Sequence, residues 1–322
     1  MPLVTPTRGE TEGQRHPVSP PARSRAPAAN ASLAQHPQPP LAAYRLSSLL
    51  ALAALVASVV GVFFPGVFRD PPMTAGNAQG TSLVILVVAI PAVVVGMLWT
   101  ARARAGGLGS LRAEIVWLGA LGYLAYNGVI FAFDTAFNEL FLAYVAMLSL
   151  AVWSLVVLLT HARVNGVRAE FRHAATVRAI AAYMLAVVAL FAFTWLSQII
   201  PALVTHRVPS PLVGTKMLTS PVHVLDLGFL LPATTLAAIW LWQRRAWGYF
   251  LAGVMLVMVL IETASIATDQ WFGHLHDPSA PLATVPMFAV FTLIGLVPTV
   301  ALLWHLHRSA SFVPDDRRSR WP

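Results

Sequence analysis

The sequence contains no cysteine, and only 11% of its 322 residues are charged. The first absence excludes disulfides, thiolate nucleophiles, iron–sulfur clusters and zinc sites with cysteine ligands. The second excludes a water-soluble protein, because soluble domains carry roughly a quarter charged residues. Apolar residues make up 57% of the chain, and the mean hydropathy is +0.69. These values also exclude a disordered chain, and they leave a polytopic α-helical membrane protein.

Several catalytic and nucleotide-binding motifs are also missing. The chain has no Gly-x-x-x-x-Gly-Lys-Ser/Thr loop, no His-Glu-x-x-His and no Gly-x-Ser-x-Gly. No apolar stretch carries a regular arginine ladder, a deep lysine or two deep histidines that face each other. These absences argue against a P-loop ATPase, the usual metalloproteases and serine hydrolases, a voltage sensor, a retinal protein and a haem protein.

Long apolar runs alternate with short polar connections from residue 41 onward. A helix rises 1.5 Å per residue, so roughly twenty residues cross the ~30 Å hydrocarbon layer. By this measure we expect about eight transmembrane helices, over 44–66, 81–101, 112–133, 139–160, 178–201, 223–242, 247–268 and 284–305. The predicted fold is an all-α polytopic membrane bundle at 41–308, with a disordered Pro/Arg-rich tail at 1–40 and a short basic tail at 309–322.

The basic residues predict the orientation of this bundle. With the N-terminus in the cytoplasm, eighteen arginines fall on the cytoplasmic side, and only Arg69, Arg207 and Lys216 fall on the other side. This distribution predicts that both termini are cytoplasmic, in a bacterial inner membrane whose anionic inner-leaflet lipids meet the arginines. The net charge of +8 is spread over separate segments, so it does not indicate nucleic acid. The basic link at 161–177 is expected to lie on the membrane surface as a short amphipathic helix.

Ionisable groups within the spans are the main candidates for function, because a charge at mid-bilayer costs at least ~2.5–3.5 kcal/mol. Glu262 is the deepest of them, and it is either a hydrogen-bonded packing residue or a proton or ion site. His223 and Asp226 are three residues apart and share a helix face. The position of Asp226 in the first turns of its helix is equally explained by the helix dipole, whose positive end stabilises a carboxylate there. His223, Asp226 and Glu262 together could supply three ligands to a divalent metal, which is the one cofactor that we consider.

Uncharged polar residues extend this group on neighbouring helices. Asn127 lies about two turns inside the span predicted at 112–133, and Gln198 lies near the outer end of the span predicted at 178–201. Asp134 and Asp269 are expected to be solvated residues at helix ends. Asn127, Gln198, His223, Asp226 and Glu262 therefore predict a polar layer in the outer half of the membrane, with a water-accessible cavity open to the exterior.

Prolines inside the spans predict kinks. Pro91, Pro232, Pro286 and Pro298 each lack the N–H that would bond four residues back along a helix. Pro232 lies about one and a half turns below Asp226, so a kink there would help to open the cavity. Pro286 and Pro298 are equally explained as packing kinks.

Three functions fit this pattern. The first is a small-solute or ion transporter that uses the outward-facing cavity. The second is a non-catalytic membrane scaffold or assembly subunit, in which the polar layer serves only helix packing. The third is a membrane-embedded, metal-dependent enzyme that acts on a lipid-linked substrate through His223, Asp226 and Glu262. The sequence alone favours the transporter.

Overall fold

The computed structural model describes residues 39–105, 110–162, 164, 167–169, 171, 174–209, 212–213 and 217–308. The tails predicted at 1–40 and 309–322 lie outside the described residues, apart from Pro39 and Pro40.

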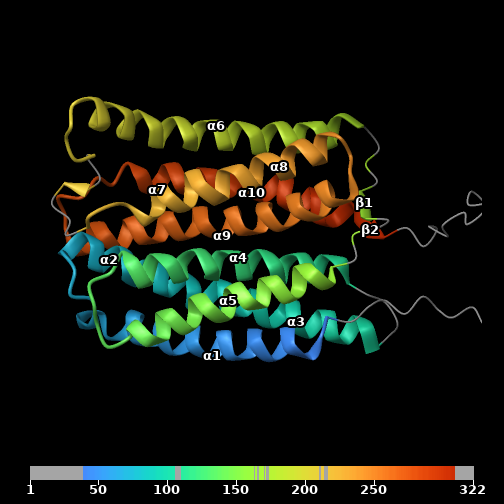
Figure 1. Ribbon diagram of the computed structural model, residues 1–322, viewed down its shortest axis with the longest axis horizontal. Helices are drawn as coiled ribbons and strands as arrows, with labels where there is room; N and C mark the ends of the chain where they lie inside the picture. The colour runs from blue at the N-terminus through green and yellow to red at the C-terminus, as the bar shows by residue number, and fades with distance from the viewer. Residues whose placement is uncertain are drawn as a thin grey trace, which may run out of the picture. The chain divides into compact units, whose positions relative to one another are not determined.

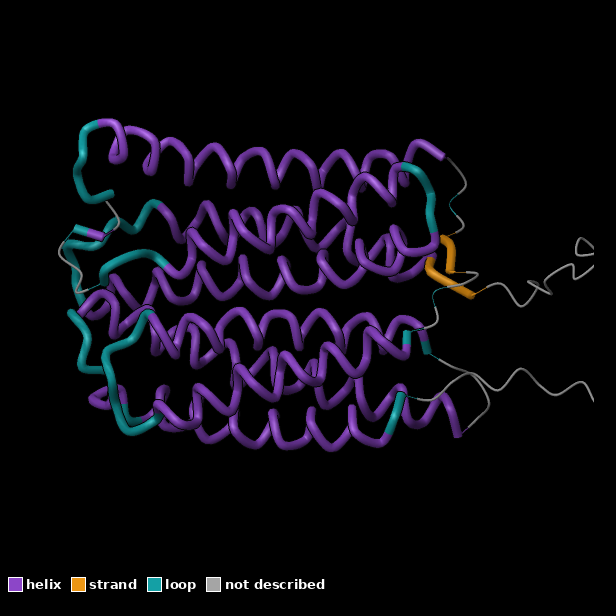
Figure 2. Tube along the Cα trace, in the orientation of Figure 1, coloured by secondary structure: helices purple, strands orange, loops and turns teal. Residues whose placement is uncertain are grey.

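Eight helices in the described part of the chain are long and apolar enough to cross a membrane, which confirms the predicted all-α bundle. They run side by side, with the longer described loops at one end and two short strands at the other (Figures 1 and 2). Six are single helices: α1 (Leu41–Phe63), α4 (Leu111–Phe133), α5 (Phe141–His161), α6 (Ala174–Val204), α9 (Ala246–His276) and α10 (Thr284–His305). The protein is an integral membrane protein with several membrane-spanning helices.

The other two helices each contain a π-helical turn. One is composed of α2 (Pro72–Val84), the turn η2 (Ile85–Ala89) and α3 (Ile90–Ala105); the other is composed of α7 (Pro221–Leu225), the turn η4 (Asp226–Leu230) and α8 (Leu231–Trp242). Each π turn is followed, after one residue, by a proline, Pro91 or Pro232. A wider turn accommodates the missing N–H and the bulk of the proline ring. At these two prolines, where the sequence predicts kinks, the structure has a π turn. Pro298 lies inside α10.

Serine residues cap two of the helices. The hydroxyl of Ser110 accepts a hydrogen bond from the N–H of Ala113 at the start of α4, and the hydroxyl of Ser220 accepts one from the N–H of His223 at the start of α7. Each bond satisfies one of the backbone N–H groups that the first turn of a helix leaves open.

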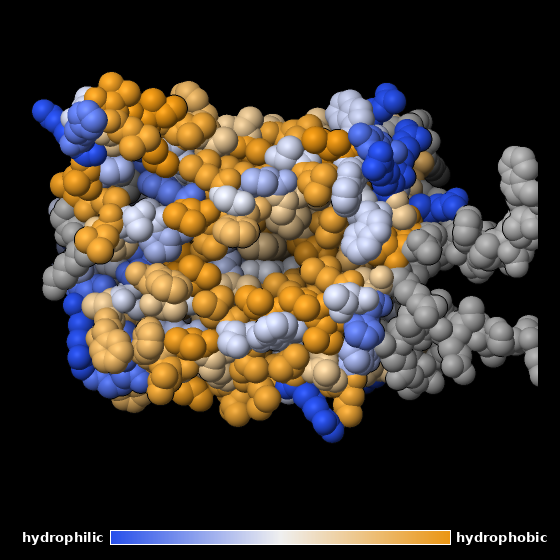
Figure 3. Space-filling model, in the orientation of Figure 1, coloured by the Kyte–Doolittle hydropathy of each residue, from blue (hydrophilic) through white to orange (hydrophobic). Residues whose placement is uncertain are grey.

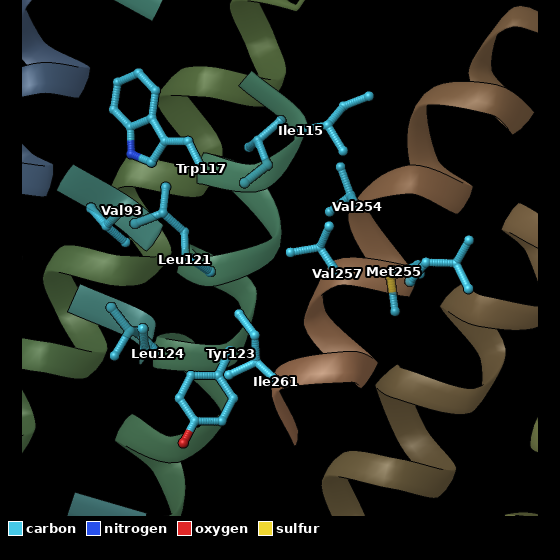
Figure 4. Close-up of a cluster of buried hydrophobic side chains, with 14 of the residues drawn as sticks. Val93, Ile115, Trp117, Leu121, Tyr123, Leu124, Val254, Met255, Val257 and Ile261 are labelled. Atoms are coloured by element: carbon cyan, nitrogen blue, oxygen red, sulfur yellow. The ribbon is translucent and has the colours of Figure 1, made fainter. Parts of the chain in front are cut away.

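Helices α4 and α9 form the centre of the bundle. In their most apolar stretches, 67% and 61% of the residues are buried, compared with 17% in α6 and in α10. Figure 4 shows the contact between them, where Ile115, Tyr123, Val254 and Val257 lie between the two helices. Since α6 and α10 leave most of their apolar surface outside the protein, these two helices offer the largest share of their length to lipid.

Glycine brings α2 directly against α9. A Cβ atom at Gly80 would lie 2.5 Å from the Cα of Asp269, and one at Gly76 would overlap the backbone of Phe272. Two glycines four residues apart lie on the same helix face, and in membrane proteins this pattern permits close backbone contact. The contact fixes the part of α9 that carries Asp269.

The two ends of the bundle differ in polarity and structure. We call the end with strands β1 (Val167–Ala169) and β2 (Leu306–Arg308) the strand end, and the end with the connections 64–71, 134–140 and 277–283 the loop end. The strands pair in antiparallel fashion, and Arg112 donates hydrogen bonds to the carbonyls of Trp304 and Leu306 beside them. Hydrophobic side chains dominate the middle of the surface in Figure 3, and hydrophilic ones gather at the ends.

The strand end corrects one prediction and carries most of the described arginines. Within the link 161–177, Val167–Ala169 form strand β1 and not an amphipathic helix, because β1 gains backbone hydrogen bonds from β2, which comes from the far end of the sequence. The described arginines are concentrated at this end, on Arg45, Arg102, Arg112, Arg168, Arg178, Arg244 and Arg245. Arg69 and Arg207 lie at the loop end. The arginine asymmetry of the sequence therefore corresponds to two physically opposite ends.

Candidate functional site

A cavity of about 710 Å³ lies in the loop-end half of the bundle. Residues of α2, α4, α6, η4, α8, α9 and the first turns of α10 line it. Four of the five predicted site residues, Asn127, Gln198, Asp226 and Glu262, are part of this lining. The tertiary structure thus brings residues from four separate helices to one space, and it also adds side chains that the sequence pattern did not single out.

Asp226 is the first residue of the π turn η4, and it is buried. Its Oδ1 accepts a hydrogen bond of 3.0 Å from the hydroxyl of Tyr126 on α4. Its Oδ2 accepts one of 2.8 Å from the indole N–H of Trp195 on α6. The carboxyl therefore connects three helices, and both of its donors are aromatic residues that also line the cavity.

Glu262 lies near the middle of α9 and faces Asn127 on α4. The Nδ2 of Asn127 donates to Oε2 of Glu262 at 3.1 Å and to the backbone carbonyl of Tyr123 at 3.2 Å. One turn further along α9, the hydroxyl of Ser265 accepts a hydrogen bond of 2.9 Å from the hydroxyl of Tyr123 on α4. The amide of Asn127 thus holds the Glu262 carboxyl at the wall of the cavity.

Asp134 and Asp269 are not the simple solvated end residues that we expected. Both line the cavity. Asp269 accepts hydrogen bonds from Gln270 at 3.1 Å and from Thr81 on α2 at 3.5 Å. It lies within α9 because this helix continues to His276, well beyond the end at 268 that its hydropathy predicts. The predicted end of the helix came too early, because the polar residues among 269–276 lower the hydropathy without ending the helix.

Asp134 lies at the loop end, just after the last residue of α4. It also borders a second cavity of about 510 Å³, whose lining includes Asp70, Met217 and Pro221. Burial, followed by the charge of the nearby Asp70, raises the pKa of Asp134 from 3.8 to about 6. Thr74, Asp134 and Thr135 belong to the walls of both cavities, so these residues lie between the main cavity and the space at the loop end.

Three polar side chains in the cavity wall have an oxygen without a hydrogen-bond partner. They are Thr234 on α8, through Oγ1, Gln198 on α6, through Oε1, and Asp134 just after α4, through Oδ1. Only 4% of Thr234 is exposed. Buried polar atoms are normally paired, so each open oxygen in a cavity wall is a position where a bound molecule can bond.

His223 does not share the cavity wall with the other predicted residues. Its ring lies against the indole of Trp195, with the ring centroids 4.8 Å apart. Within the part of the chain that the structure describes, no three His, Asp or Glu side chains form a group that could hold a metal ion. The set of His223, Asp226 and Glu262 is thus not assembled as a metal site, because His223 faces α6 while Glu262 faces α4.

Comparison with protein-family models, with curated proteins and with solved structures gives no match.

Proposed function

We propose that the protein is a transporter that moves a small solute or ion through the cavity between α4, α6, α8 and α9. The observation that supports this function is the cavity itself. Its volume of about 710 Å³ lies within the range of roughly 300–1,000 Å³ that is usual for small-molecule sites. Helices that associate only to build a stable bundle pack to nearly crystalline density, and they do not leave a space of this size lined with carboxyl groups.

The arginine distribution supports a direction for this cavity. The strand end carries most of the arginines and would face the cytoplasm under the positive-inside rule. The cavity would then lie in the outer half of the membrane, with Asp134 near its outer limit. A transporter of this kind loads its solute from the exterior side and must open toward the strand end during its cycle.

A non-catalytic scaffold is the alternative function, and one observation favours it. Both oxygens of Asp226 are bonded to donors on neighbouring helices, which is the arrangement expected of a polar residue that holds helices together. A scaffold needs no movement of the cavity between the two sides of the membrane. The two functions therefore differ in whether the cavity is reached from one side or from both.

Site-directed labelling tests this difference, because the sequence has no native cysteine. Thr234→Cys places a single thiol in the cavity wall with little change in volume. A membrane-impermeant thiol reagent is applied to intact cells and to inverted vesicles. For a transporter we expect labelling from both sides.

Two other single cysteines serve as controls. Leu218→Cys lies on a fully exposed residue of the loop end and should react from one side only, which also establishes the orientation. Ser154→Cys lies on α5 at a fully buried position outside the cavity and should react from neither side. Labelling of Thr234→Cys from one side only, or from neither, would contradict transport and support the scaffold.

A further inference from the structure

The lining of the main cavity carries charge of only one sign. Its carboxyl groups are Asp134, Asp226, Glu262 and Asp269, and no Arg, Lys or His is among the described lining residues. The one ion pair found in the described parts of the chain joins Arg69 to Glu139, which is exposed at the loop end. Within those parts, none of the four carboxyls forms an ion pair with a basic side chain.

Such an arrangement needs either protonation of the carboxyl groups or a cation from elsewhere. Removing a carboxylate from water without a partner is costly, and inside a membrane this cost is compensated by a positive charge or by protonation. Glu262 and Asp269 lie two turns apart on one face of α9, so their carboxyls stand at two levels, separated by about 10 Å along the helix. Asp226 reaches the same space from η4. A positively charged ligand would thus meet an acidic group at more than one depth.

The open oxygen atoms point to the same ligand chemistry. Oγ1 of the buried Thr234 and Oε1 of Gln198 line the cavity without a partner. A carboxamide oxygen only accepts hydrogen bonds, and a hydroxyl oxygen also accepts them. A ligand that brings N–H donors would therefore satisfy both.

Most of the rest of the wall is apolar or aromatic. Aromatic rings from three helices, α4, α6 and α10, line the cavity, on Tyr126, Phe131, Phe191, Trp195 and Phe288. Aromatic faces attract cations, and they also bury apolar groups. The cavity is much larger than an inorganic ion, whereas its size and mixed wall suit a molecule with a charged group and an apolar body. We propose that the ligand of this cavity is an organic cation of the amine class, and its transport rests on the function proposed above.

Direct binding of two matched ions tests the charge preference. Tetraphenylphosphonium and tetraphenylborate have nearly the same shape and opposite charge. We expect the purified protein to bind the phosphonium saturably and the borate at least about tenfold more weakly. Glu262→Gln and Asp226→Asn should each weaken phosphonium binding by about tenfold or more. Asp277→Asn, at an acidic residue outside the cavity lining, should leave it unchanged. Equal binding of the two ions, or unchanged phosphonium binding by both cavity variants, would overturn the proposal.

A second measurement keeps all four carboxyls in place, so it does not depend on the folding of the charge variants. Thr234→Cys is treated with a cationic and with an anionic methanethiosulfonate, 2-(trimethylammonium)ethyl and 2-sulfonatoethyl. Their rates are normalised to those on the exposed Leu218→Cys. We expect the cationic reagent to react at least about tenfold faster in the cavity. A ratio near one, or a preference for the anion, would overturn the proposal.

The outcomes separate this proposal from the transport function. Labelling of Thr234→Cys from both sides, combined with no preference for cations, would retain transport and reject the organic cation. Cation-selective binding with labelling from one side only would retain the cation site and reject transport.

Discussion

The indole N–H of Trp195 donates a hydrogen bond of 2.8 Å to the Oδ2 of Asp226. This bond connects α6, one of the two most peripheral helices of the bundle, to the π turn that precedes Pro232. Trp195 and Asp226 also form part of the cavity wall. A movement of α6 away from the bundle would break the bond and open the cavity on that side.

Loss of this bond should destabilise the protein slightly. Trp195→Phe removes the indole N–H and leaves Oδ2 of the buried carboxyl without a donor. Hydrogen bonds between membrane helices contribute about 0.6 kcal/mol on average and up to about 1.7 kcal/mol. We expect a loss within that range, measured by unfolding in detergent. A double-mutant cycle with Asp226→Asn isolates the pair.

Trp153→Phe is the matched control for this measurement. Trp153 lies on α5 with 58% of its surface exposed, so the same change there should leave stability within about 0.5 kcal/mol of the wild type. An equal effect of the two substitutions would show that the Trp195 bond contributes nothing beyond the change of ring size.

Glu262→Gln should leave the protein as stable as the wild type or make it more stable. The glutamine carbonyl still accepts the hydrogen bond from Asn127, and the group that has to be buried no longer carries a charge. Asn127→Ala has the opposite effect, because it removes the donor and leaves the carboxyl, and we expect a loss of about 1–3 kcal/mol. Thermal unfolding of both variants in detergent measures the difference. A strongly destabilised Glu262→Gln together with a stable Asn127→Ala would contradict this account of the pair.

Gly80→Val should be strongly destabilising. A Cβ there would lie 2.5 Å from the Cα of Asp269, so α2 and α9 must separate to admit the side chain. Overpacking of this kind typically costs about 1–3 kcal/mol. Gly228→Ala in η4 is the control, since a Cβ at that position meets no atom within 4 Å. This control should be neutral or stabilising, because alanine favours helix more than glycine does. Unfolding curves in which Gly80→Val matches the wild type would exclude the close contact.

Asp134 should make stability depend on pH. Its pKa in the folded protein is raised to about 6, so the folded state holds this proton more tightly than the unfolded state. The contribution of Asp134 to stability is therefore greatest below about pH 4, decreases as the pH rises toward 6, and stays constant above that. Asp134→Asn should be more stable than the wild type at pH 7, with a difference that shrinks toward pH 4.

Asp277→Asn should show the opposite sign. Hydrogen bonds from Ser279 lower the pKa of this exposed carboxyl, so its contribution to stability is present at neutral pH and is lost in acid. Unfolding of the wild type and of each variant across pH 4–7 measures both effects. A pH profile of Asp134→Asn parallel to that of the wild type would contradict the raised pKa.

Hydropathy was sufficient to locate all eight spans, and it was least accurate at their ends. The span predicted to begin at 81 starts at Pro72, and the span predicted to end at 268 continues to His276. Polar residues such as Asn77 and Asp269 lower the local hydropathy, although the backbone there remains helical because it packs against another helix. The prediction of Asp269 as a solvated end residue was wrong for this reason.

Composition and the spacing of apolar runs determined by themselves that this chain is a bundle of eight membrane helices, because a bilayer requires long apolar segments whose backbone groups bond internally. The positions of Glu262 and Asp226 in the sequence also indicated that polar groups lie inside the bundle. Only the tertiary structure decided which side chains share a space. Asn127 meets Glu262 and Trp195 meets Asp226, while His223 turns toward α6, since the rotation of each helix about its axis depends on packing with its neighbours.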